Sequence, residues 1–266
     1  MSELLRSILL GIIQGLTEFL PVSSSGHLEI FNALFAGDQK LDSDFTMVLL
    51  VHLGTSLSIV WVFWEDILNI FKGIFTLDRT NEEVKLVGEI IISMIPALVI
   101  GLLFEERIEA MFEGGIMHIG FFLLFTAGIL WITPQLDGES SGIGWKKAFL
   151  IGLAQAVAIM PGISRSGMTI AAALFLGTGK KEAARFSFLM VLPVIFGKMI
   201  LDFVSGDFQI DSTNMFSILA ALVSSFIVGI IACRWMISIV RDSKLQYFAI
   251  YCGIVGLLVI AGSLYG

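Results

Sequence analysis

Long apolar runs constrain this chain more than any other feature of its sequence. Several of them approach or exceed the roughly 18 residues at which a run becomes a candidate transmembrane helix. Charged residues make up 15% of the 266 residues and hydrophobic residues 56%, whereas a soluble domain carries about 25% charged residues. The net charge of -7, without a basic tract, gives no support to a nucleic-acid partner. The sequence therefore predicts an all-α polytopic membrane protein with a single membrane domain.

The chain contains two similar halves. The stretch "GIIQGLTEFLPVSSSG" (11–26) aligns with "GLAQAVAIMPGISRSG" (152–167), and two shorter matches follow in the same order. We therefore predict one repeat at about 1–135 and a second at about 144–266. The apolar segments that make up these repeats are predicted at 4–20, 24–36, 44–64, 86–104, 115–133, 146–160, 166–177, 186–204, 215–233 and 245–264.

Each half begins with two short segments that Pro and Gly interrupt, and continues with three longer ones. If each interrupted pair enters the membrane and returns, the three remaining spans force the halves to run in opposite directions. The prediction is an inverted-topology repeat with six transmembrane helices and two re-entrant helix pairs. Irregular backbone at membrane depth requires protein or water as a hydrogen-bonding partner, so the two interrupted pairs also predict a cavity.

Lysine and arginine are unevenly distributed among the predicted loops. Eleven of the sixteen lie in the loops at 65–85, 134–147, 178–185 and 234–244. Three others would lie on the opposite side of the membrane. The positive-inside rule makes the rich side cytoplasmic. Both termini and the loops around Asp38, 105–113 and 207–211 are then predicted to face outward.

Glu18 is an ionisable residue within the first apolar segment. Burying an ionisable side chain in a membrane costs free energy, so a function is the first hypothesis for such a residue. Gln14 lies four residues earlier, on the same helix face. A partly desolvated carboxylate suits general acid or base work. The alternative is a structural carboxylate that the backbone or an arginine satisfies.

The loop after Pro21 carries polar chemistry of a second kind, with three hydroxyls and an imidazole. Its residues are Ser23, Ser24, Ser25, Gly26 and His27. A serine-rich turn before a helix presents N–H donors to an anion. Ser24, three residues before His27, is a candidate nucleophile beside a candidate base. The alternative is an ordinary helix cap.

The matching loop of the second half, "PGISRSGMT", contains Arg165 at the position that Ser24 occupies in the first. Arginine is suited to bidentate phosphate recognition. The small and hydroxyl residues around it are Ser164, Ser166, Gly167 and Thr169. If the two loops meet, Arg165 faces Ser24, Glu18 and His27, a set that fits phosphoryl transfer. The alternative is that Arg165 is a structural ion-pair partner of Glu18.

With these two motifs the chain resembles the undecaprenyl-diphosphate phosphatase family, integral-membrane enzymes associated with bacitracin resistance. "QGLTEFLPVSSSGH" is similar to the family's first motif and "PGISRSGMT" to its second. The resemblance covers essentially the whole chain. It implies hydrolysis of undecaprenyl diphosphate, which recycles the lipid carrier for cell-wall synthesis. It also implies a multi-pass protein of the bacterial plasma (inner) membrane whose active site opens to the outer face.

The resemblance further implies a role for each motif residue. Ser24 would be the nucleophile and Arg165 the phosphate-binding residue, with Glu18 and His27 as the acid–base candidates between which the sequence does not decide. The substrate-binding set would be Gln14, Ser23, Ser25, Gly26, Ser164, Ser166, Gly167 and Thr169. A divalent cation, Mg²⁺ or Ca²⁺, is implied, with Glu18 as its ligand. Gln14 stands where many members have Glu, which puts metal coordination there in doubt.

Two other functions are compatible with the same pattern. Inverted repeats with interrupted helices suit alternating access, so a flippase or transporter of the isoprenyl phosphate carrier is the main alternative. An ion channel or purely structural bundle is disfavoured, because a pore is expected to repeat one charge sign. The sequence does not fix the oligomeric state, and a homodimer stays among the alternatives.

Overall fold

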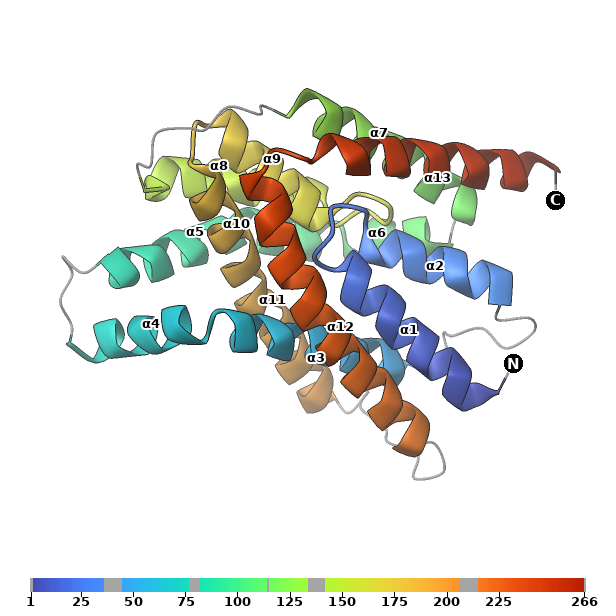
Figure 1. Cartoon of the computed structure of the whole chain (residues 1–266), viewed down its shortest axis with the longest axis horizontal. Coiled ribbons are helices and arrows are strands. Elements are labelled where there is room, and N and C mark those ends of the chain that lie inside the picture. The colour runs from blue at the N-terminus through green and yellow to red at the C-terminus, as the bar shows by residue number, and fades with distance from the viewer. Residues whose placement is uncertain are drawn as a thin grey trace.

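The computed structural model describes residues 2–35, 45–76, 82–113, 115–133, 142–205 and 215–265, and the regular structure in these residues is helical throughout (Figure 1). The all-α prediction is therefore confirmed. The helices are α1 (Glu3–Thr17), α2 (Ser24–Phe35), α3 (Phe45–Val62), α4 (Trp64–Thr76), α5 (Glu82–Leu103), α6 (Glu105–Glu113), α7 (Ile116–Ile132), α8 (Gly144–Val157), α9 (Arg165–Phe175), α10 (Lys180–Leu189), α11 (Val191–Ser205), α12 (Met215–Arg241) and α13 (Gln246–Tyr265).

Four stretches of the described chain are long and apolar enough to cross a membrane. They are α5, the run formed by α10 and α11 up to Leu201, α12 and α13. Helices α3 and α4 bend by 78° at their junction and make a fifth if the pair is one span. The apolar helix α7 is shorter, at 17 residues. A membrane protein with several spans is thus supported, whereas the count of six is not confirmed.

Five segments predicted as loops contain helix. These are 65–85 (α4 and the start of α5), 105–113 (α6), 134–147 (the start of α8), 178–185 (the start of α10) and 234–244 (the end of α12). The loop predictions were wrong because hydropathy marks where an apolar run ends, whereas a helix ends at a capping residue or a break. The predicted outward loops around Asp38 and 207–211 lie outside the described residues.

Small residues bring α1 into close contact with α12, and α12 with α3. An added Cβ at Gly15 would lie 2.9 Å from the Ser225 carbonyl oxygen, and one at Gly229 would lie 2.6 Å from the Ser58 hydroxyl. Within a membrane, helices associate through such close packing rather than through the hydrophobic effect. These contacts fix α1 among the other helices, and so they fix the position of Glu18, which follows its last residue.

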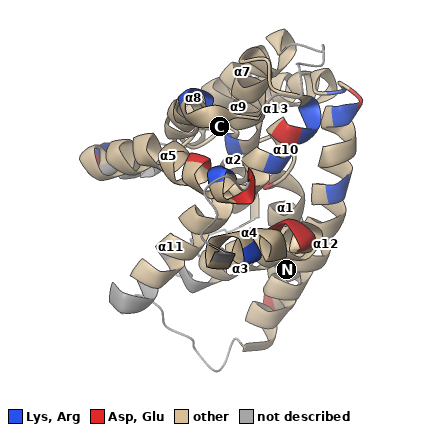
Figure 2. Cartoon of the chain, turned by 90° about the vertical axis from the view of Figure 1, so that its left-hand side faces the viewer, with Lys and Arg blue, Asp and Glu red and all other residues tan. Residues whose placement is uncertain are grey.

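The two termini and the connection from α4 to α5 lie at different ends of the molecule (Figure 1). Helix α1 begins and α13 finishes at the same end of the molecule, while α4 and α5 meet at the opposite end (Figure 1). A view onto that opposite end shows Lys and Arg on α8, α10 and α12 (Figure 2). One of them, Arg185 of α10, binds Asp66 of α4 at 2.6 Å and Glu83 of α5 at 3.0 Å.

Candidate active site

The two interrupted helix pairs meet at their turns. An added Cβ at Gly26 would lie 3.1 Å from the Gly162 Cα, and one at Gly167 would lie 3.2 Å from the Pro21 Cβ. The Ser166 hydroxyl also donates to the Leu20 carbonyl oxygen at 3.3 Å. The loop after α1 and the loop after α8 therefore form one contact region, although 141 residues separate them in the alignment of the halves.

Both loops start their second helix with the same hydrogen bond. The Gly26 N–H donates to the Ser23 hydroxyl at 3.3 Å, and the Gly167 N–H donates to the Ser164 hydroxyl at 3.1 Å. Ser23 has a φ of 70°, in the left-handed region that is costly for a residue with a Cβ. The first turns of α2 and α9 are thereby directed into the same region, where their positive dipole ends favour an anion.

Glu18 is the centre of the hydrogen bonds in this region. It follows the last residue of α1 and is only 8% exposed. Its carboxylate accepts hydrogen bonds from Gln14 Nε2 at 3.0 Å and from the Ser24 hydroxyl at 2.8 Å. The same carboxylate forms an ion pair with Arg165 Nη2. The first-half loop, α1 and the second-half loop thus converge on one buried side chain.

Arg165 is oriented by two acceptors. Its Nη2 donates to Glu18, and its Nη1 donates to the Ser187 carbonyl oxygen at 3.3 Å. Ser187 lies on α10, and its hydroxyl is 2.6 Å from the Thr169 hydroxyl. Sequence reasoning did not find Ser187, because a backbone carbonyl that serves as acceptor leaves no residue-type signal.

Both ring nitrogens of His27 are engaged away from Ser24. Nδ1 lies 2.8 Å from the Ser23 carbonyl oxygen. Nδ1 must carry the proton, since a carbonyl oxygen only accepts. In the neutral ring, Nε2 then accepts from the Tyr251 hydroxyl, which lies 2.8 Å away. Sequence reasoning also missed Tyr251, because it lies in an otherwise ordinary apolar segment of α13.

Exposure divides the predicted site residues into two groups. Ser24, Ser25, His27 and Arg165 are partly exposed. The remaining predicted residues are buried, and these are Gln14, Glu18, Ser23, Gly26, Ser164, Ser166, Gly167 and Thr169. A molecule that enters the site meets the first group directly. The buried residues of the second group stabilise the conformation of the two loops. The chemical role of each residue stays a prediction.

His52 of α3 is a further polar side chain near this centre. It interacts electrostatically with the Glu18 carboxylate, and its Nδ1 donates to the Val48 carbonyl oxygen at 2.8 Å. Its apolar sequence neighbours gave no reason to select it. A third segment of the first half therefore contributes to the field around Glu18.

The groups around Glu18 are compatible with a sparsely liganded cation. Among the described residues, no group of three or more His, Cys, Asp and Glu side chains could hold a metal ion. The Gln14 Oε1 atom, however, is buried without a hydrogen-bond partner beside Glu18. One carboxylate and one amide oxygen fit Mg²⁺, which takes few protein ligands and completes its shell with water and substrate phosphates.

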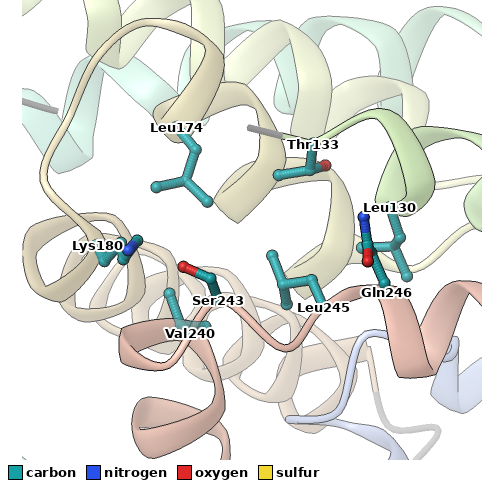
Figure 3. A pocket seen from close by; sticks show the side chains of 8 residues that line it. All are labelled: Leu130, Thr133, Leu174, Lys180, Val240, Ser243, Leu245 and Gln246. Atoms are coloured by element: carbon teal, nitrogen blue, oxygen red, sulfur yellow. The ribbon is translucent and has the colours of Figure 1, made fainter. Parts of the chain in front are cut away.

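A small cavity lies elsewhere in the structure, between the ends of α7 and α9 and the turn from α12 to α13. Its volume is about 10 Å³, roughly enough for one water molecule. Figure 3 shows the eight lining residues, Leu130, Thr133, Leu174, Lys180, Val240, Ser243, Leu245 and Gln246. None of them belongs to the predicted site, and the cavity is too small for a diphosphate.

Comparison with known proteins decides the family. The chain matches the family described as "Bacitracin resistance protein BacA" over residues 7–258. The chain belongs to the BacA family. Proteins named undecaprenyl-diphosphatase are similar over nearly their whole length. That of Christiangramia forsetii is 50% identical over 262 residues, which cover 97% of each chain. That of Bacteroides thetaiotaomicron is 46% identical over 263 residues, or 96% of this chain and 97% of the relative.

Membership of the BacA family confirms the resemblance inferred from the two motifs. The matched region contains both loops and all the residues that converge on Glu18. Together with the apolar helices, it identifies the chain as a multi-pass membrane protein.

The ion pair between Glu18 and Arg165 can be tested by its contribution to stability. The side chains are 7% and 17% exposed, and removing one partner of such a buried pair typically costs about 3–5 kcal/mol. We expect Glu18→Gln and Arg165→Gln each to lower the free energy of unfolding in detergent. The double variant should lose less than the sum by about 1–3 kcal/mol.

The control pairs Glu18→Gln with Arg241→Gln, because the Arg241 side chain is 74% exposed and contacts Asp242 instead. Those two effects should add. Additivity in the Glu18 and Arg165 cycle would contradict the contact that the structure shows.

Proposed function

We propose that this BacA family member hydrolyses undecaprenyl diphosphate to undecaprenyl phosphate and inorganic phosphate. The observation that carries the proposal is the hydrogen bond of 2.8 Å from the Ser24 hydroxyl to Glu18, whose carboxylate also binds Arg165. A hydroxyl can attack phosphorus, a carboxylate can take its proton and a guanidinium can stabilise the charge that develops, so the three groups suit phosphoryl transfer through a covalent intermediate. The names of the relatives support the same reaction.

Binding would place the terminal phosphate between the two loops. Arg165 is partly exposed and can exchange one of its acceptors for a phosphate oxygen. The N–H groups in the first turns of α2 and α9 supply further donors to an anion at that position. Because this anion is bound next to Ser24, its phosphorus comes within reach of the hydroxyl oxygen.

The reaction would proceed in two displacements. The Ser24 oxygen attacks the terminal phosphorus while its proton passes to Glu18, and the bridging P–O bond breaks to release undecaprenyl phosphate. Water then attacks the phosphoserine, the Ser24 oxygen leaves and recovers its proton from Glu18, and phosphate departs with both protons of the water. Arg165 stabilises the charge that develops on the non-bridging oxygens in each displacement.

The geometry favours Glu18 over His27 as the base. Glu18 is within hydrogen-bonding distance of Ser24, whereas the His27 ring nitrogens bond to Ser23 and Tyr251. His27 would instead fix the Ser23 carbonyl and so support the left-handed turn that presents Ser24. General-base removal of the Ser24 proton is then assigned to a carboxylate.

The cellular setting follows from the same proposal. The enzyme would lie in the bacterial plasma membrane with its site opening to the outer face, and it would recycle the lipid carrier for cell-wall synthesis. Bacitracin resistance would result from the supply of the monophosphate. The uneven distribution of Lys and Arg supports this orientation.

Replacing the proposed nucleophile or the phosphate-binding residue should abolish activity. We expect Ser24→Ala and Arg165→Ala to release no phosphate above background from undecaprenyl diphosphate, while circular dichroism shows unchanged helix content. Ser263→Ala is the control for Ser24, because it removes a partly exposed hydroxyl that only donates to the Val259 carbonyl of its own helix, and it should keep the activity. Near-normal turnover by Ser24→Ala would contradict the mechanism. If that variant still moved the lipid across vesicles, the transport alternative would gain support.

The assignment of the base predicts unequal effects at Glu18 and His27. General-base catalysis contributes typically about 10²–10⁴-fold, so we expect a loss of kcat in this range for Glu18→Gln. His27→Asn should lose less, because the Asn amide nitrogen takes the place of Nδ1 and can still donate to the Ser23 carbonyl. Steady-state phosphate release gives both values. A larger loss at His27 than at Glu18 would reverse the assignment.

A divalent cation, Mg²⁺ or Ca²⁺, is proposed as the cofactor. Glu18 and Gln14 Oε1 would hold it, and it would supply positive charge against the substrate's phosphates. We expect a chelator to lower phosphate release and added Mg²⁺ or Ca²⁺ to restore it. Gln14→Glu adds a second carboxylate and should lower the cation concentration needed for half-maximal activity. Activity that a chelator leaves unchanged would exclude this cofactor.

A further inference from the structure

A second and larger cavity has a volume of about 510 Å³. It lies between the end of α1, the loop after it, the last turns of α12 and the start of α13. Its walls include Thr17, Val22, Trp235, Phe248 and Tyr251. This volume falls within the range of roughly 300–1,000 Å³ that is typical of small-molecule sites.

The cavity begins beside the candidate active site. Thr17, in its wall, directly precedes Glu18, and Tyr251, in the opposite wall, donates to His27 Nε2. The next residue of α13, Cys252, donates from its thiol to the Pro21 carbonyl oxygen at 3.6 Å. In Figure 1 the loop between α1 and α2 lies in the angle between α12 and α13. Helix α13 therefore both lines the cavity and contacts the loop between α1 and α2.

The chemistry of the walls indicates a hydrocarbon occupant. They are mainly apolar and aromatic, and their one charged side chain, Lys244, already pairs with Asp242 at 3.4 Å. A second phosphate group would find no uncompensated cation here. Trp235 and Tyr251 are 52% and 44% exposed, so the cavity opens on the outside of the helix bundle, where a lipid chain can enter.

We infer that this cavity receives the isoprene units next to the diphosphate, and that Tyr251 links their binding to the catalytic loop. The inference rests on the proposed function and names the part of the substrate that the cavity would take. A chain in the cavity packs against Tyr251, whose hydroxyl holds His27. His27 in turn holds the Ser23 carbonyl, directly before Ser24.

The link has a kinetic consequence. Binding energy from a remote, non-reacting part of a substrate can be used to organise the reacting centre, so a truncated substrate loses kcat as well as affinity. Farnesyl diphosphate, with three isoprene units, should therefore turn over faster at saturation than isopentenyl diphosphate, with one. Tyr251 is assigned here as a positioning residue, not as one that touches the reacting atoms.

Two pairs of measurements test the inference with purified full-length protein. Trp235→Ala opens the cavity wall and should lower the farnesyl to isopentenyl ratio of kcat/KM by about three- to tenfold, because packing energies within a membrane environment are modest. Trp131→Ala removes a similarly exposed tryptophan from α7, outside the cavity, and should leave the ratio unchanged.

Tyr251→Phe keeps the ring and should remove the kcat advantage of farnesyl diphosphate while its KM stays the same.

A binding experiment separates this inference from the proposed function. A diazirine-bearing, hydrolysis-resistant farnesyl methylenediphosphonate should label residues 247–251 upon illumination, and unlabelled farnesyl diphosphate should compete. Label spread over all lipid-facing helices, or displaced equally well by phospholipid, would overturn the inference. An unchanged ratio in Trp235→Ala would also overturn it. If wild-type protein did not hydrolyse undecaprenyl diphosphate, the proposed function would fail, while the labelling would still report on the cavity.

Discussion

The ion pair between Glu18 and Arg165 is the interaction on which the arrangement of the site depends. It joins a residue at the end of α1 to the first residue of α9, across two loops that are distant in the chain. Two charges in an apolar environment are favourable only when further hydrogen bonds satisfy the remaining atoms. Gln14 and Ser24 do this for the carboxylate, and the Ser187 carbonyl does so for the guanidinium. Ser24, the candidate nucleophile, is thus one of the hydrogen-bonding groups that stabilise the buried ion pair.

Close helix packing sets the depth and direction of that pair. Gly15 lets α1 lie against α12, and Gly229 lets α12 lie against α3, at distances that larger side chains would prevent. On the other side, Arg185 anchors α10 to α4 and α5, two residues before the carbonyl that holds Arg165. The position of the carbonyl that holds the guanidinium therefore depends on the contacts between α10 and the helices α4 and α5.

Sequence reasoning succeeded where the membrane restricts the outcome. Apolar run length predicted an all-α membrane protein, and the cost of a carboxylate and an arginine inside apolar segments singled out Glu18 and Arg165. Sequence reasoning failed at helix ends, as with α4 and the last turns of α12. Charged residues there predict loops, but a helix can continue through charged residues. The same reasoning also missed Ser187 and Tyr251. The first acts through its backbone, and the second acquires its role only because α13 passes beside the loop.

The sequence similarity of the two loops explains how both contribute to one site. Ser23 and Ser164 make the same capping bond, so the backbone frame is shared. The chemistry is not shared, since Arg165 replaces the nucleophile position and Ile159 occupies the position that matches Glu18. Gln155 matches Gln14 but, with Ile159 beside it, both of its buried amide atoms lack a hydrogen-bond partner. The second-half loop has no carboxylate at the position that matches Glu18, and Arg165 pairs with the carboxylate of the first half. That pair joins the two loops, and it lies within hydrogen-bonding distance of the Ser24 hydroxyl.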